Sequence, residues 1–374
     1  MKKKYVLFSI VTLVLLVALI TSFNYFKTTN TYIDDSVNNQ TKITKGISMN
    51  LEQTAGAGDY KTVTQSSWPT EGYKFNAELS KCEKGSTLSW DDTKKAVIVS
   101  GNLSDKCYVY FDIYQPTLAE YIKSQYTGTQ GDNGIYYHNS TLANGAGDNS
   151  YRFAGASDSV NNYICLGSDK ATCPDANLFR IIGVFGAQTK VIRAKSVGNK
   201  QWHTSKDNTW SSSSLNTYLN GEYLTSLGTL ADKIATTTWK VGGGTYESIL
   251  TSVPATAYQY EVGSSASTTT YEAKIGLMYA SDYGFAASSS AWTTKLSSYS
   301  SNTSKNWLYL GSYEWTISRN SDYTSRAFYV LSTGDVSDGS TVTESYAARP
   351  SFNLLSSTTY VSGSGSMSDP VRVN

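Results

Sequence analysis

The stretch NWLYLGSYEWTISRNSDYTSRAFYVLSTGDVSDGSTVTESYAARPSFNLL, residues 306–355, decides the fold of this chain. In it, short apolar runs at 327–331 and 351–355 alternate with clusters of Ser, Asn, Asp, Gly and Tyr. Apolar runs bounded by turn residues predict buried strands, and the polar clusters predict surface loops. Tyr, Ser, Asn and Gly are also the residues that adaptable binding surfaces use. The stretch therefore predicts a recognition surface on a β scaffold.

The composition favours a mainly β protein that works outside the cytosol. Of the 374 residues, 16% are charged and 40% are hydrophobic, and the chain holds 29 Tyr and 29 Gly. A cytosolic helical protein would carry more Glu, Lys and Ala. The net charge is +1. Because nucleic-acid-binding proteins normally show a basic face, we expect no nucleic-acid partner.

The amino-terminal segment predicts a membrane anchor. Lysines at 2–4 precede an apolar run at 5–26 that contains no charge. As a helix this run spans about 33 Å, enough to cross a hydrocarbon core of about 30 Å. The lysine excess before the run predicts residues 1–4 in the cytoplasm and an extracellular body, as in a single-pass cell-membrane protein. A cleaved signal peptide is the alternative, but the run exceeds a usual h-region and no A-x-A-like site follows it.

The four cysteines fit that outward topology as two local pairs. Three connectivities are possible. We expect Cys82–Cys107 and Cys165–Cys173, because each pair lies within one apparent unit. In the chain-entropy model each bridge contributes about 2.5–3.5 kcal/mol. Metal binding is the weaker alternative, since the chain has no C-x-x-C and only two histidines. We therefore expect structural disulfides, no metal and no cofactor.

A small β domain is expected after a short stalk. Residues 27–46 are polar and rich in Thr and Asn, which predicts a linker. Residues 47–114 predict a disulfide-bonded β-sandwich, whose bridge would offset the weak core of so small a unit. Its strand candidates are 47–52, 73–77, 87–90, 96–100 and 107–113. The segments EGYKFNAELSKCEKGSTLSW and SDKCYVYFD resemble a recurrent stalk-like module of exported proteins in Gram-positive bacteria and their relatives.

The second domain is expected over 115–374, with its core at 177–374. Pro116 disfavours a helical residue before it, which places the boundary there. Thr117 and Glu120 predict a capping box for the short helix LAEYIKSQ. A hairpin is expected from 178–185 and 190–195, then a helix that begins near Ser213. Further strands are expected at 234–240, 248–251 and 272–278.

This order of elements resembles the C-type-lectin-like fold, in the branch of formylglycine-generating enzymes and retroelement-diversified variable proteins. The match covers about 117–374 and is strongest in the last third. The matching residues are Trp210, Leu215, Tyr218, Leu219, Asn220, Trp307, Glu314, Trp315, Thr316, Gly334, Arg349, Pro350, Ser351, Phe352, Asn353 and Leu354. The resemblance implies a fold class that is mainly β, with an α+β head on the small β-sandwich and the predicted transmembrane helix.

Two properties of those relatives do not carry over. Formylglycine-generating enzymes rely on cysteines in their carboxy-terminal region, and this chain has none after Cys173. The calcium-dependent sugar site of true C-type lectins needs a Glu-Pro-Asn or Gln-Pro-Asp loop and a Trp-Asn-Asp triplet, and neither occurs here. What the resemblance implies is a scaffold that displays variable loops, without a defined chemistry.

The expected binding residues cluster just before the closing strand, where diversified relatives carry their ligand contacts. They are Tyr313, Arg319, Asn320, Asp322, Tyr323, Arg326, Tyr329, Asp335, Asp338, Glu344 and Tyr346. Structural roles are expected for Trp210, Trp307, Trp315, Arg349 and Pro350. By the resemblance, Arg349 ties the last strand to the core through an acidic partner such as Glu314. We expect no catalytic residue.

Other polar residues have simpler explanations. His138 and His203 lie 65 residues apart without a nucleophile motif, so we expect exposed loop histidines. Asp207, Asp282 and Asp322 are explained by turn chemistry. The run 242–244 is Gly-Gly-Gly without a following Lys-Ser/Thr, which predicts a flexible turn and not a phosphate loop.

Three functions remain open on the sequence. The first is a cell-surface binding protein or adhesin that takes an extracellular protein or glycan through its Tyr/Ser/Asn-rich loops. The second is a glycan- or cell-wall-directed enzyme, which needs a carboxylate pair in a deep cleft. The third is a pilin-like subunit that acts by assembly.

Overall fold

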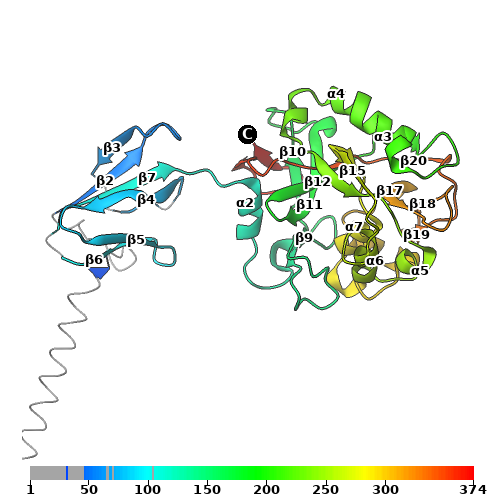
Figure 1. The fold of residues 1–374 in the computed structure, drawn as a ribbon, viewed down its shortest axis with the longest axis horizontal. Helices are drawn as coiled ribbons and strands as arrows, with labels where there is room; N and C mark the ends of the chain where they lie inside the picture. Colours follow the sequence, from blue (N-terminus) through cyan, green and yellow to red (C-terminus); the bar gives the residue numbers. More distant parts are fainter. Residues whose placement is uncertain (1–30, 33–45, 65–66, 70, 103–104) are drawn as a thin grey trace, which may run out of the picture. The chain divides into compact units, whose positions relative to one another are not determined.

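The computed structural model describes residues 31–32, 46–64, 67–69, 71–102 and 105–374. The chain divides into two compact units, residues 1–115 and 116–374 (Figure 1). The step between them falls at Gln115–Pro116.

The described part of the first unit forms two sheets. One has the strand order β3-β2-β7-β4 and the other β1-β6-β5. The strands are β1 (Thr31–Tyr32), β2 (Ile47–Glu52), β3 (Tyr60–Val63), β4 (Tyr73–Cys82), β5 (Thr87–Asp91), β6 (Ala96–Ser100) and β7 (Cys107–Ile113). Strand β7 reads CYVYFDI, and its alternate residues Cys107, Val109 and Phe111 are fully buried, as the two-residue period of a strand dictates.

Phe111 joins the two sheets of this unit. Its ring lies 5.6 Å from Trp90 of β5 and 5.9 Å from Phe75 of β4. At one end Cys82 and Cys107 are direct partners across β4 and β7, and their Cα atoms are 4.0 Å apart. The expected disulfides are confirmed both here and at Cys165–Cys173.

The second unit, all of which the structure describes, is built on a nine-stranded sheet. The main path runs β16-β21-β12-β11-β10-β23-β22, while β9 pairs with β11 and with β8. Its strands are β8 (Ile135–Tyr137), β9 (Tyr151–Phe153), β10 (Tyr163–Cys165), β11 (Leu178–Phe185), β12 (Gln188–Arg193), β16 (Ile275–Gly276), β21 (Ser351–Asn353), β22 (Tyr360–Ser362) and β23 (Val371–Val373).

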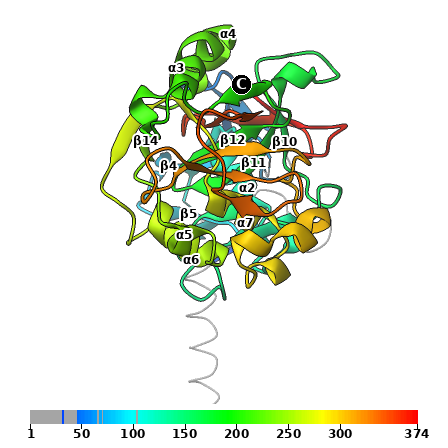
Figure 2. The same cartoon turned by 90° about the vertical axis from the view of Figure 1, so that its right-hand side faces the viewer.

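A five-stranded sheet of order β13-β20-β17-β18-β19 carries the residues expected to bind a ligand. Figure 2 turns its orange strands toward the viewer. The five strands of this sheet are β13 (Asn199–Gln201), β17 (Glu314–Arg319), β18 (Ala327–Val330), β19 (Val336–Ser337) and β20 (Ser345–Ala347). A separate two-stranded antiparallel sheet pairs β14 (Thr237–Lys240) with β15 (Thr270–Ala273).

The helices of this unit are short. They are α2 (Leu118–Ser124), α3 (Ser214–Tyr218), a π-helical turn (Leu219–Tyr223), α4 (Leu224–Ser226), α5 (Tyr246–Ile249), α6 (Pro254–Glu261) and α7 (Ala280–Ala286). Ser213 caps α3 by accepting a hydrogen bond from the Asn216 N–H at 3.1 Å. Thr117 and Glu120 form the expected capping box of α2.

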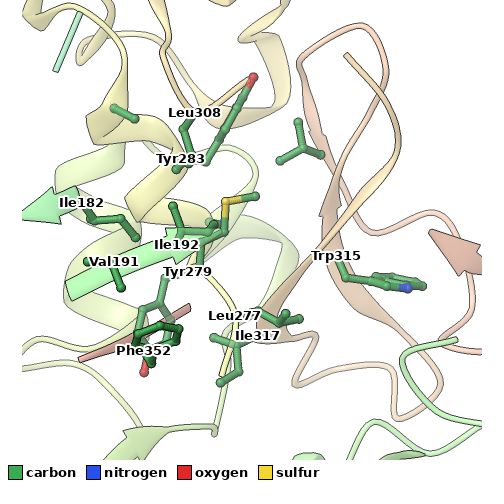
Figure 3. Packing of buried hydrophobic residues seen from close by; sticks show 14 of the residues in the cluster. Ile182, Val191, Ile192, Leu277, Tyr279, Tyr283, Leu308, Trp315, Ile317 and Phe352 are labelled. Atoms are coloured by element: carbon green, nitrogen blue, oxygen red, sulfur yellow. The ribbon is translucent and has the colours of Figure 1, made fainter. Parts of the chain in front are cut away.

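The β11–β12 hairpin fixes the centre of the fold. Phe185 pairs with Gln188, so the chain reverses over two residues, and Gly186 supplies the positive φ of +65° that such a turn requires. Figure 3 shows Val191 and Ile192 of β12 within the main core, together with Phe352 of β21 and Ile317 of β17. The core therefore joins the nine-stranded sheet to the five-stranded one.

The first and last segments of the second unit lie together. The Leu118 N–H donates to the Thr358 carbonyl at 2.7 Å, and Tyr121 stacks on Tyr360 with ring centroids 3.6 Å apart. Strand β10 pairs in parallel with β23. Residues from both ends of the sequence therefore close one side of this sheet.

Two expectations about secondary structure are corrected. The predicted membrane-spanning helix is not supported. The expected cell-membrane localisation depended on that helix and is therefore not supported either. Residues 5–26 lie outside the described residues, and none of the described helices is long and apolar enough to cross a membrane. The longest continuous helical run, 214–226, spans about 20 Å, against about 30 Å of hydrocarbon. The strand expected at 248–251 is also wrong, because Thr245 caps helix α5 there.

Candidate functional site

Four aromatic rings form a layer on the five-stranded sheet, which we call the aromatic platform. Trp315 of β17 and Tyr329 of β18 are cross-strand partners, with ring centroids 5.5 Å apart. Tyr346 of β20 lies 4.7 Å from Trp315 and 4.9 Å from Tyr329. Tyr313, just before β17, stacks on Tyr346 at 5.0 Å with an angle of 27° between the rings. Contacts of this kind hold aromatic side chains in fixed orientations.

The platform has a buried layer and an exposed layer. Trp315 and Tyr329 are buried, and the indole N–H of Trp315 donates to the Lys200 carbonyl at 2.9 Å. Tyr346 is half-buried, and this burial raises the pKa of its phenol. Tyr313 remains 43% exposed. The outer rings are therefore available to a ligand, while the inner rings support them.

The platform continues into the loop that follows β18 and β19. The hydroxyl oxygen of Ser340 lies 2.9 Å from that of Tyr329 and accepts a hydrogen bond from the Tyr346 hydroxyl at 2.6 Å. The next residue, Thr341, forms an antiparallel bridge with Arg326. The Arg326 guanidinium lies over the ring of Tyr323 at 4.6 Å, and Tyr323 is 53% exposed.

A buried asparagine that the sequence analysis did not single out holds this loop. The Asn208 side-chain amide donates to the carbonyl of Asn320 at 2.7 Å, of Tyr323 at 3.0 Å and of Arg326 at 2.6 Å. Asn208 is fully buried. The two N–H bonds of this amide thus lie within reach of three carbonyls of the segment 320–326. The carbonyls of Tyr323 and Arg326 also accept backbone N–H groups, so Asn208 adds to the hydrogen bonds that the segment makes within itself. No local signal marks this role, because its partners are more than 110 positions later in the chain.

The expected binding residues divide into supporting and exposed groups. Asn320 and Asp338 are buried, and the Asn320 amide donates to the Asp338 carboxylate at 2.6 Å. The Asn320 side-chain oxygen also accepts from the N–H groups of Asp322 and Tyr323. Asp335 accepts from the Ser300 N–H at 2.6 Å. The exposed group comprises Tyr313, Asp322, Tyr323 and Glu344, with Arg326 and Tyr346 half-buried.

Beneath the platform a buried ion pair fixes the start of β17. The Arg349 Nε lies 2.6 Å from Glu314 Oε1, and its Nη2 donates to Oε2 at 2.8 Å and to the Leu308 carbonyl at 2.5 Å. Both side chains are buried. Burial raises the pKa of Glu314, and the charge of Arg349 opposes this shift. Trp210 and Trp307, for which structural roles were expected, are also buried, as is Pro350.

Arg319 lies apart from the platform, at the other end of β17. It lines a groove of about 520 Å³, which we call the glycine-loop groove after its lining residues Gly242, Gly243 and Gly244. The groove runs between residues 242–248, helix α6 and the end of β17. The Arg319 Nε donates to the Gly242 carbonyl at 3.0 Å. At Gly243, with φ +66°, a Cβ atom would come within 1.9 Å of the Arg319 carbonyl oxygen. The glycine run, expected as a flexible turn, is therefore a packed loop that only glycine allows.

Two candidates expected in exposed loops are buried. His138 is 0% exposed, accepts a hydrogen bond from the Ala146 N–H at 3.0 Å, and packs against Phe285 and Trp292. Burial lowers the pKa of His138 well below its usual value, so the imidazole is neutral. Asp282 is also buried, 2.5 Å from the Lys190 ammonium. His203 is partly exposed, and its Nδ1 accepts from the Ser205 N–H.

The side chains on these surfaces determine which ligands they contact. In the described parts of the chain, no group of three or more His, Cys, Asp or Glu side chains is placed to hold a metal ion. The glycine-loop groove has one lining carboxylate, from Glu247. Acid–base hydrolysis of a glycan uses two carboxylates across the scissile bond. What the described surface offers instead is supported aromatic rings and hydroxyl groups.

The comparisons with known proteins reach only part of the chain. A family described as Domain of unknown function (DUF6273) matches residues 187–356. The matched part contains the aromatic platform and the residues of the glycine-loop groove. No curated protein and no solved structure matches the chain.

Proposed function

We propose that the second unit is a recognition domain that binds a protein ligand through the aromatic platform and the adjoining loop 320–326, without catalysis. The stack of Tyr313 on Tyr346 over the buried Trp315 is the observation that carries this proposal. A solvent-facing tyrosine with a fixed ring binds at low entropic cost, because the orientation is already set before the ligand arrives.

The surroundings of the platform add specificity. Arg326 and the exposed side chains of Asp322 and Glu344 give both signs of charge around the exposed rings. Charges at the rim of an interface direct the approach and exclude partners with the wrong pattern, while aromatic anchors provide most of the affinity. Arg326 also contacts the Tyr323 ring, which restricts both side chains before binding.

The two disulfides and the resemblance to the C-type-lectin-like fold also support this proposal. Both disulfides indicate an oxidising compartment, outside the cytosol. A domain that displays loops for a ligand is also what the resemblance to the C-type-lectin-like fold implies. We therefore favour a binding protein or adhesin over an enzyme or an assembly subunit.

Binding of the full-length protein to arrays of extracellular proteins tests the proposal. We expect a specific hit that is lost in Tyr313→Ala and in the double variant Tyr313→Ala/Tyr346→Ala. Tyr246→Ala is the matched control, because Tyr246 is 44% exposed and lies outside the platform. Near-UV circular dichroism checks that each variant folds. A hit that survives both platform variants, or an array without any hit, would refute the proposal.

A further inference from the structure

We propose that the glycine-loop groove binds a neutral oligosaccharide, at a site that contains none of the four platform rings and shares Ser321 with the adjoining loop 320–326. The groove has a volume of about 520 Å³, which is in the range of small-molecule binding sites. Its walls come from three parts of the second unit: the glycine loop 242–244 with α5, the helix α6 with the segment after it, and the end of β17. This inference does not depend on the proposed protein ligand.

The groove is held in shape by its own contacts. The Gly244 N–H donates to the Arg319 carbonyl at 3.2 Å, and the Ser321 N–H donates to the Gly244 carbonyl at 2.9 Å. Arg319 Nε closes the same corner by binding the Gly242 carbonyl. Backbone hydrogen bonds thus join one wall to another before any ligand is present, which lowers the entropic cost of binding.

Hydrogen-bonding groups without a protein partner line the groove. In the described structure, no hydrogen bond engages the side-chain oxygens of Thr256, Tyr260, Ser265, Ser321 or Glu247. Neighbouring hydroxyls differ: those of Ser248 and Ser252 donate to the backbone of α5 or its N-cap. The open groups are mostly hydroxyls, which both donate and accept. A ligand rich in hydroxyl groups is their natural complement.

Helix α6 adds an aromatic face to these hydroxyls. Thr256 and Tyr260 are four residues apart, so they lie on the same side of the helix, and both are exposed. The opposite side of α6 buries Ala257 and Glu261. Tyr260 is 41% exposed. A tyrosine ring beside hydroxyl groups suits a pyranose, which presents an apolar C–H face and a polar edge.

The charges in the groove favour a neutral ligand. Glu247 is exposed and repels an anion, while Arg319 has its Nε engaged by the Gly242 carbonyl and its Nη1 near the Asn208 side-chain oxygen. A phosphate or carboxylate ligand would need several free cationic donors. One partly engaged arginine opposite one carboxylate leaves the groove close to neutral.

Calorimetric titration of the full-length protein with defined sugars tests this inference. The neutral probes are maltohexaose, cellohexaose, xylohexaose and N-acetylated chitohexaose; the charged probes are hexagalacturonate and fully deacetylated chitosan hexamer. We expect at least one neutral probe to bind. Tyr260→Ala should weaken it at least tenfold, and Tyr260→Phe, which keeps the ring, by less than threefold.

The outcomes separate this site from the platform. Tyr313→Ala should leave the sugar affinity unchanged, so loss of sugar binding in that variant would overturn the assignment to the groove. Equal affinity of Tyr260→Ala and the unsubstituted protein would do the same. Binding of only hexagalacturonate or only the chitosan hexamer would contradict a neutral ligand, and absence of binding to every probe at millimolar concentration would refute a sugar site.

Discussion

Removing Arg349 should destabilise the second unit strongly, because it leaves the buried carboxylate of Glu314 without its partner. The pair is joined by two charge-assisted hydrogen bonds, and Arg349 makes a third to the Leu308 carbonyl. Breaking a buried pair of this kind costs about 3–5 kcal/mol. We therefore expect Arg349→Met and Glu314→Leu each to lower the free energy of unfolding by about 4 kcal/mol at pH 7.5.

The double variant discriminates between a paired and an independent role. Independent costs would add to about 8 kcal/mol. Replacing both charges leaves no unpaired ion and removes only the hydrogen bond to the Leu308 carbonyl, so we expect a total of about 1–3 kcal/mol. Urea unfolding of the full-length protein, monitored by tryptophan fluorescence, measures these values. A single-variant cost below about 1 kcal/mol, or a double variant at the full sum, would refute the reasoning.

The stability of the single variant Arg349→Met should also depend on pH. Burial raises the pKa of Glu314, and Arg349→Met removes the opposing charge. A carboxyl with a folded pKa above its unfolded value stabilises the fold when protonated and loses that stabilisation as pH rises through the folded pKa. The Arg349→Met variant should therefore regain stability between pH 7.5 and 5, relative to the unsubstituted protein. A constant difference across this range would contradict a buried Glu314 carboxyl.

Three further changes test other parts of the structure. Replacing Cys82 and Cys107 with Ser should lower the free energy of unfolding of the first unit by about 3.5 kcal/mol, measured by urea unfolding, and a change below about 1 kcal/mol would contradict a structural bridge. Because the folded pKa of His138 lies below its unfolded value, stability should fall as pH drops below about 6.5, by at most about 1.4 kcal/mol per pH unit. The variant His138→Asn should lose that slope, and an unchanged slope would assign it to another group. Asn208→Ala should cost about 1–3 kcal/mol and speed hydrogen exchange of the amides at 322–326, and unchanged exchange there would show that Asn208 does not hold the loop.

Local signals in the sequence predicted local structure well. The capping box at Thr117 and the turn at Gly186 both depend on contacts within a few residues, so the sequence contains all of their partners. The strand expected at 248–251 was wrong because local helix signals were given too little weight. Thr245 and Ser248 form a capping box there, and Pro254 begins the next helix. Those start signals were present but were outweighed by the β-branched and apolar residues around them.

Buried polar residues could not be predicted from the sequence alone. His138 and Asp282 looked like loop residues, because the groups that make their burial favourable lie elsewhere in the chain. Lys190, the ion-pair partner of Asp282, is 92 residues away. Buried charges require such partners, and only the tertiary fold brings them together.

The sequence predicted that several tyrosines of the candidate site lie near one another. It did not predict which of them are buried and which are exposed. The tyrosines at 313, 329 and 346 were expected to share one surface, and the pairing of β17, β18 and β20 brings them into contact. The sequence did not show that Tyr329 supports the others from below. Nor did it show that the register of β17 against β18 shifts between Trp315 and Arg319, or that Arg319 lines the groove.

The meeting of the two ends of the second unit has a consequence for synthesis. Tyr121 contacts the Gly363 carbonyl 242 residues later, and Arg372 binds the Ser168 carbonyl 204 residues earlier. A ribosome makes the chain from its amino terminus, so β10 cannot pair with β23 until almost the whole unit has been synthesised. Ordering such distant contacts is slow. During that time the apolar strands β11 and β12 remain incompletely covered, and a chaperone that protects them would raise the yield of folded protein.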